Sequence, residues 1–197
     1  MAGVFLATWW QPIWPEEQAL HTSLTLVAFV LLWQYLRRYR MSDLDFFLLV
    51  LFLCVHSVAA RWLYSNVPYD HCLQAVTGFS LHQYMGWTRN HFDRLVHFLY
   101  GFCFTPVLVS HFIRYRHCSP KNGFMLAITL IMLTSLWYEW FEWLIAIMLS
   151  NADAEAYNGQ QGDIWDAHKD MLLATVGSLA WAWRYRSAQT VRLASEL

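Results

Sequence analysis

Five long apolar segments, separated by shorter polar ones, dominate the chain. They cover roughly residues 18–36, 44–64, 92–113, 123–149 and 166–185. Each is close to the ~20 residues that a helix needs to cross the hydrocarbon core of a bilayer. Because lipid offers backbone groups no water partner, helices are the favoured form, and residues 44–55 lack the alternation of a barrel strand. The pattern predicts an all-α integral membrane protein, a bundle of about five transmembrane helices that form one domain over residues 1–197.

Composition agrees with a membrane setting. The chain is 57% hydrophobic and only 14% charged, with a net charge of −1, whereas soluble domains carry about 25% charged residues. These values exclude a disordered chain and a basic nucleic-acid-binding surface, so the expected partners are membrane lipids and not nucleic acid. The four cysteines show no paired spacing, which argues against a disulfide framework. Oligomeric state stays open, because lipid-facing and partner-facing apolar surfaces look alike in sequence.

Lysine and arginine gather on one side of the predicted membrane. Nine lie in the turn after the first segment, the turn after the third, and the C-terminal tail: Arg37, Arg38, Arg40, Arg114, Arg116, Lys121, Arg184, Arg186 and Arg192. The opposite side carries only Arg89. Since cytoplasmic loops are enriched in these residues, we expect a multi-pass membrane protein with its N-terminus outside and its C-terminus in the cytoplasm.

Ionisable side chains within the predicted spans gather in the half of the membrane near its outer face. They are His56 and Arg61 in the second span, Asp93, Arg94 and His97 in the third, Glu139 and Glu142 in the fourth, and Asp163, Asp166, Lys169 and Asp170 where the fifth begins. Spacings of three or four residues place Asp93 with His97, and Glu139 with Glu142, on one helix face each. Such residues inside a membrane usually face the bundle interior and mark a functional site.

Carboxylates outnumber cations in this layer, by six to three. Either some of the carboxyls carry a proton or a cation is bound among them. An oxygen-rich set with one or two imidazoles suits a divalent metal, namely Zn, Mn or Fe. The candidate ligands are His56, Asp93, His97, Glu139, Glu142, Asp166 and Asp170.

A metal site at this depth indicates hydrolytic chemistry, because a bound ion can activate a water molecule for attack on a phosphate or an ester. The favoured interpretation is a metal-dependent membrane-embedded enzyme, a hydrolase that acts on a lipid or lipid-linked substrate. Asp93, Glu139 and Asp166 are its candidate catalytic residues, and Arg94, Lys169 and Asn90 its candidate substrate-binding residues.

Two other interpretations stay open. Chains of Asp, Glu and His in membranes also form proton or ion pathways in transporters. The layer could instead be structural, with Arg94 paired to Asp163 or Glu142, and Lys169 paired to Asp166 or Asp93. Other residues have plain structural explanations: Asn90 as a helix cap, Gly101 and Gly177 as helix-packing points, and His21 as a solvated side chain near a helix end.

Three motifs carry a family resemblance: Asn90–Phe98 (NHFDRLVHF), Tyr138–Trp143 (YEWFEW) and Gln161–Met171 (QGDIWDAHKDM). Over roughly residues 45–180, the chain resembles the YjdF-type family of bacterial inner-membrane proteins, whose function is uncharacterised. The resemblance therefore implies a multi-pass protein of the bacterial inner (cytoplasmic) membrane, but no reaction. A more distant similarity, an acidic helix followed by an Asp-rich helix with glycine, links the chain to the VanZ-type membrane proteins.

Overall fold

The computed structural model describes residues 1–148 and 159–185, and this part of the chain is helical without strands. Its helices are α1 (Ala2–Thr8), α2 (Pro15–Arg38), α3 (Asp43–Arg61), α4 (Tyr69–Thr77), α5 (Leu81–Met85), α6 (Phe92–Arg116), α7 (Pro120–Met148) and α9 (Asp166–Leu179). Helices α2, α3, α6 and α7 are each long and apolar enough to cross a membrane. The all-α membrane class is thus confirmed.

The fifth predicted span is shorter than expected as a continuous helix. Helix α9 has 14 residues, and a turn at residues 180–181 separates it from a further helical stretch at 182–185. The predicted end of the fourth span at residue 149 lies just outside the described residues, since α7 is described to Met148. Residues 186–197 of the predicted cytoplasmic tail also lie outside them.

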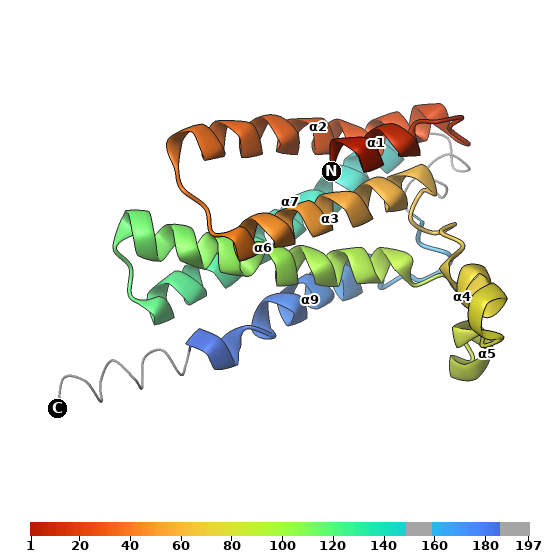
Figure 1. Cartoon of the computed structure of the whole chain (residues 1–197). Helices are drawn as coiled ribbons and strands as arrows, with labels where there is room; N and C mark the ends of the chain where they lie inside the picture. Colours follow the sequence, from red (N-terminus) through yellow and green to blue (C-terminus); the bar gives the residue numbers. More distant parts are fainter. Residues whose placement is uncertain (149–158, 186–197) are drawn as a thin grey trace.

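Helix α6 is the centre of the bundle. It packs against α3, α7 and α9, while α7 also packs against α9, and α2 packs against α3 (Figure 1). The closest approach is between α6 and α9, where two glycines meet backbone. A Cβ atom on Gly101 would overlap the carbonyl oxygen of Ala174, and one on Gly177 would overlap that of Phe98. Both glycines are therefore packing points, as the sequence predicted.

A proline in α6 creates a second link between α6 and the segment after α9. Pro106 has no N–H, so the carbonyl of Phe102 one turn earlier loses its partner within the helix. The indole Nε1 of Trp181 donates a hydrogen bond to this carbonyl, at 2.8 Å. Trp181 lies in the turn that follows α9. This turn therefore supplies the hydrogen-bond donor that Pro106 removes from α6.

The short helix α1 is fastened to the bundle at its C-terminal end. The guanidinium of Arg61 donates hydrogen bonds to the carbonyls of Thr8, Trp10 and Gln11. The side-chain amide of Gln18 also donates to the carbonyl of Thr8, at 3.0 Å. Arg61 therefore binds carbonyls at and just beyond the end of α1, and among the described residues it makes no ion pair with the carboxylates of the polar layer.

Helices α4 and α5 form a hairpin beyond one end of the long helices (Figure 1). The Asp70 carboxylate accepts hydrogen bonds from the backbone N–H groups of Leu81 and His82 and from the hydroxyl of Ser80, so it caps the start of α5. The basic turns lie at the opposite end, where the carbonyl of Arg40 accepts from Arg114 and from the Tyr115 hydroxyl. Charge asymmetry predicts that the hairpin end is the outer one.

Native cysteines allow a test of this orientation. Cys72 is exposed on the α4 hairpin, and Cys118 lies in the turn between α6 and α7 at the basic end. In variants that keep one of these two cysteines, we expect a membrane-impermeant maleimide to label Cys72 in intact cells, and Cys118 only after the membrane is broken. Labelling of Cys118 in intact cells, with Cys72 protected, would establish the reverse orientation.

Candidate metal centre

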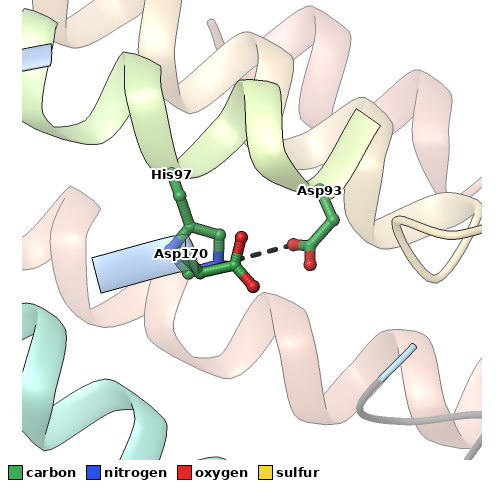
Figure 2. A group of neighbouring side chains, drawn as sticks. All are labelled: Asp93, His97 and Asp170. Carbon is green, nitrogen blue, oxygen red and sulfur yellow. Dashed lines mark ion pairs between the residues drawn. The ribbon is translucent and has the colours of Figure 1, made fainter. Parts of the chain in front are cut away.

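Three side chains from two helices meet inside the bundle. Asp93 and His97 lie one turn apart on α6, and Asp170 faces them from α9 (Figure 2). Each residue offers a ligand atom, and these atoms all lie within 4.8 Å of one another. The exposed fractions are only 8% for Asp93, 8% for His97 and 3% for Asp170. This arrangement of two carboxylates and an imidazole could hold a divalent cation.

The close packing of α6 and α9 explains why these side chains meet. Gly101 follows His97 by one turn, and Gly177 follows Asp170 by two turns, so the glycines lie on the faces that carry the three side chains. Because neither glycine has a Cβ atom, the two backbones come into direct contact there. Asp170 thereby comes near His97 despite the short reach of its side chain.

A third carboxylate approaches from α7. Glu139 is 9% exposed, and its Oε1 lies 4.0 Å from Nδ1 of His97, while Nε2 of the same ring lies 3.4 Å from Oδ1 of Asp93. Oε1 of Glu139 and Oδ1 of Asp170 are buried with no hydrogen-bond partner in the described part of the chain. Unsatisfied buried carboxylate oxygens are costly. A cation between them would remove that cost.

A second polar group lies toward the hairpin end and is built from ion pairs. Arg89 Nη1 contacts Asp166 Oδ1 at 2.6 Å and Asp163 Oδ2 at 3.3 Å. Arg94 pairs with Asp163 and lies 3.4 Å from Asp166 Oδ1. Lys169 Nζ pairs with Asp163 at 2.6 Å. This outer ion-pair group (Arg89, Arg94, Asp163, Asp166 and Lys169) joins the loop before α6 to the start of α9.

The outer ion-pair group changes the count of charges made from the sequence. Arg61 binds backbone carbonyls near α1 and leaves the count, whereas Arg89, which the sequence placed in an outer loop, joins it, so the layer has three cations: Arg89, Arg94 and Lys169. The cations compensate Asp163 and Asp166, whereas no ion pair with Arg or Lys reaches Asp93, Asp170 or Glu139 among residues 1–148 and 159–185. The excess of negative charge is therefore concentrated at the Asp93–His97–Asp170 cluster.

The cations of the outer ion-pair group also lower the pKa values of Asp163 and of the neighbouring His91. The Lys169 ammonium, which donates a hydrogen bond to Asp163, holds the pKa of this carboxyl well below its usual range, and Arg94 contributes in the same direction. His91 precedes α6. Burial, followed by the nearby charges of Arg94 and Arg89, lowers the pKa of His91 to about 4. A neutral His91 can accept the hydrogen bond from Arg94 Nη1, at 3.2 Å.

Replacement of Asp163 by Asn should reduce stability in a pH-dependent way. The folded-state pKa of Asp163 lies below its ordinary value of 3.8, so its ion pairs stabilise the fold above that pH and lose their effect as pH falls through the folded pKa. We expect Asp163→Asn to melt below the parent protein at neutral pH, with a difference that shrinks below about pH 4. Thermal unfolding in detergent across this range measures it, and a constant difference would contradict the expectation.

Not all of the predicted ligands join the cluster. Asp93, His97 and Asp170 do, and Glu139 lies beside them. Asp166 is paired with Arg89 in the outer group. His56 lies on α3, where its ring nitrogens form hydrogen bonds with the hydroxyls of Thr25 and Tyr64, at 3.1 and 2.8 Å. Glu142 is half-buried on α7, one turn beyond Glu139, and is not part of the three-residue cluster.

The predicted substrate-binding residues have structural partners. Arg94 and Lys169 belong to the outer ion-pair group. Arg94 pairs with Asp163, one of the two partners expected for it. Lys169 also pairs with Asp163, and not with Asp166 or Asp93 as expected. The Asn90 side chain accepts a hydrogen bond from the Phe92 N–H at the start of α6 and donates another to the carbonyl of Val67. The N-cap residue of α6 is His91, so Asn90 binds the first backbone N–H of the helix from one position earlier than a capping residue would.

Sequence reasoning missed Arg89 and gave the wrong environment for His21. Arg89 lies outside the apolar segments, and only its partners Asp163 and Asp166, more than 70 residues away, draw it into the layer. His21 was expected to be solvated, but it is 3% exposed and its ring packs 4.9 Å from that of Tyr64. The glutamine that begins the third motif also has a structural role, because Gln161 exchanges hydrogen bonds with the backbone of Asn90.

Fold and site together define a multi-pass α-helical membrane protein with a buried cluster of carboxylates and imidazole. The family model described as "Predicted membrane protein (DUF2238)" matches residues 1–189, so the chain belongs to this family. It is also 31% identical over 146 residues to the inner membrane protein YjdF of Escherichia coli (strain K12), which covers 73% of this chain and 65% of the relative. The chain thus spans just under two thirds of that relative's length. No solved structure matches.

These comparisons confirm the resemblance to the YjdF-type family and the placement of the chain in the inner membrane as a multi-pass protein. They do not show the more distant similarity to VanZ-type proteins. The orientation of the termini also stays a prediction.

Proposed function

We propose that this protein is a metal-dependent enzyme embedded in the inner membrane, with Asp93, His97 and Asp170 as the ligands of one divalent cation. The observation that carries the proposal is the convergence of these three buried side chains within 4.8 Å, beside two carboxylate oxygens that have no hydrogen-bond partner among the described residues. Mixed carboxylate and imidazole ligands suit Zn, Mn or Fe.

Support for a bound cation also comes from charge. The outer ion-pair group shows how this protein compensates carboxylates when arginine and lysine are at hand. Asp93, Asp170 and Glu139 have no such partner in the described residues and share only the His97 imidazole. Buried carboxylates at this depth need compensation to stay ionised. A divalent cation would supply this compensation without any movement of the side chains.

The proposed reaction is hydrolysis of a lipid or lipid-linked molecule. A bound divalent metal lowers the pKa of a coordinated water and polarises a carbonyl or phosphoryl oxygen. Glu139 is the proposed general base, because its Oε1 has no hydrogen-bond partner and lies 4.0 Å from the His97 ring. Glu139 would take a proton from water as the water oxygen bonds to the carbonyl carbon or phosphorus. The C–O or P–O bond to the alcohol would then break, and Glu139 would return the proton to the leaving alkoxide. Arg94 and Lys169 would hold the start of α9 in place through Asp163.

Elemental analysis of the detergent-purified protein tests the metal, and a lipid panel tests the reaction. We expect about one equivalent of Zn, Mn or Fe for each chain, removal by a chelator, and restoration by the same ion. Loss and recovery of hydrolysis of ester- or phosphate-linked membrane lipids should follow the metal. Protein that holds none of these ions, even after incubation with each of them, would overturn the proposal.

A further inference from the structure

A cavity of about 440 Å³ lies between α2, α3, α6 and α7. Helix α2 packs against α3, whereas α7 packs against α6 and α9, so α2 and α7 face each other across the cavity without close packing. Two of the lining residues on α2, Leu24 and Leu31, are 38% and 59% exposed. In a protein that spans the membrane, this exposed surface faces lipid, so the cavity opens sideways into the bilayer.

The lining is suited to hydrocarbon. Its walls are mostly aliphatic and aromatic, with Phe52, Val96 and Phe104 among them. The volume falls within the roughly 300–1,000 Å³ of small-molecule sites. Most of the hydroxyls on the wall are already engaged: Thr25 with His56, and Tyr100 with Thr134 at 2.6 Å.

One polar atom of the lining has no partner. Ser135 is 2% exposed, and its Oγ makes no hydrogen bond within the described part of the chain. It lies on α7 one turn before Glu139, and His97 of the metal cluster contributes to the same cavity wall. A buried hydroxyl without a partner is costly, and an ester carbonyl at this position would accept its hydrogen bond.

We infer that this cavity binds one acyl chain of an ester-linked membrane lipid, which enters between α2 and α7, with its carbonyl oxygen at the Ser135 hydroxyl. The chain would run along the apolar wall, and the ester would lie where Ser135, His97 and Glu139 come together. This inference rests on the proposed function, since it names the substrate class of the same centre: a lipid whose scissile or adjacent group is a carboxylic ester.

Photolabelling locates the acyl chain directly. The purified parent protein is placed in vesicles of phosphatidylethanolamine and phosphatidylglycerol that contain a trace of phosphatidylethanolamine with a diazirine in mid-chain. After irradiation, mass spectrometry maps the labelled residues. We expect label on cavity-wall residues such as Phe52, Val96 and Phe104, in addition to the lipid-facing surface. Label confined to outward-facing residues of the parent would overturn the inference without any variant.

Two tryptophan substitutions on α2 provide a matched pair. Ala28 lines the cavity, so Ala28→Trp should fill it and remove most of the internal label. Val27 is 53% exposed on the neighbouring position, and Val27→Trp should leave the internal label unchanged. Equal labelling of the two variants would contradict a chain within the cavity.

The carbonyl contact has its own test. Ser135→Ala should lower the internal label from the ester-linked lipid, but not from an ether-linked analogue that lacks the carbonyl. Equal loss with both lipids, or no loss with either, would remove the ester from the inference.

Metal content measured on the same samples separates the two proposals. Loss of internal label in a parent that holds metal overturns the lipid site alone. A labelled cavity in a parent that takes up no metal overturns the metal centre alone.

Discussion

Replacement of both Asp93 and Asp170 by Asn should abolish metal binding and leave the protein inserted in the membrane. Asn keeps the size of each side chain but removes two of the three charged or imidazole ligands of the cluster. Loss of a partner outside the ligand set costs about 10–100-fold in metal affinity, so loss of two ligands should reduce the bound metal to background. Elemental analysis of the variant, beside a parent protein purified in the same way, measures the effect.

The stability of the double variant gives a second readout. In metal-free protein, Asp93, Asp170 and Glu139 are close to one another with no arginine or lysine pair among the described residues. Without a metal, these carboxyls stabilise the fold little, and Asn has nearly the same size and no charge, so Asp93→Asn/Asp170→Asn should melt no lower than metal-free parent. Asp163→Asn is the matched control, because it removes a carboxylate of the outer ion-pair group and should keep the metal. Retention of metal by the double variant would rule out this cluster as the binding site.

Gly101→Ala should destabilise the bundle strongly, because the added methyl group would meet backbone. The added Cβ would overlap the carbonyl oxygen of Ala174 and approach the backbone nitrogen of Ser178. Backbone cannot move aside as a flexible side chain can, so α6 and α9 would have to separate. Overpacking of a close contact costs about 1–3 kcal/mol, and occasionally more. We expect a clear fall in melting temperature in detergent, together with weaker metal binding, because the same two helices carry the ligands.

Gly123→Ala is the matched control for this substitution. Gly123 lies on α7, and a Cβ atom there would have its nearest neighbours at 3.5 Å, on Ile113 and Phe112, which is ordinary van der Waals contact. Alanine also favours helix over glycine by about 1 kcal/mol. Gly123→Ala should therefore be neutral or stabilising. Equal melting temperatures of the two variants would show that the α6–α9 contact is looser than described.

The helical membrane bundle could be predicted from the sequence because hydrophobic length reports directly on membrane spans. Boundaries were less certain where apolar residues continue past a change of chain direction. The second span was expected to reach residue 64, but α3 ends at Arg61. Leu63 and Tyr64 follow it with positive φ angles of 46° and 56°, in a turn that buries both side chains. Hydropathy registers their burial but carries no information on the backbone direction.

In the site, contacts within one helix could be predicted from the sequence, whereas contacts between helices could not. The pairing of Asp93 with His97 follows from helical spacing, and it is observed at 3.4 Å. The choice of Asp170 over Asp166 as the partner on α9 depends on how the helix is rotated and on where α6 approaches it. Sequence spacing places Asp163, Asp166 and Asp170 on one stripe, and only the positions of Arg89 and Arg94 divide that stripe into a paired end and an unpaired end.

The hydrogen bond between Trp181 and the carbonyl of Phe102 imposes an order on biogenesis. Its partners lie 79 residues apart, and a membrane protein is made from its N-terminus onward. When α6 enters the bilayer, Trp181 has not yet been synthesised, so the carbonyl freed by Pro106 enters without a partner in hydrocarbon, at a cost of several kcal/mol. The central helix of the bundle therefore reaches its final stability only when the segment beyond α9 has left the ribosome and docked. Until then, nascent chains of this protein would carry an incomplete helix that a membrane chaperone or protease could recognise.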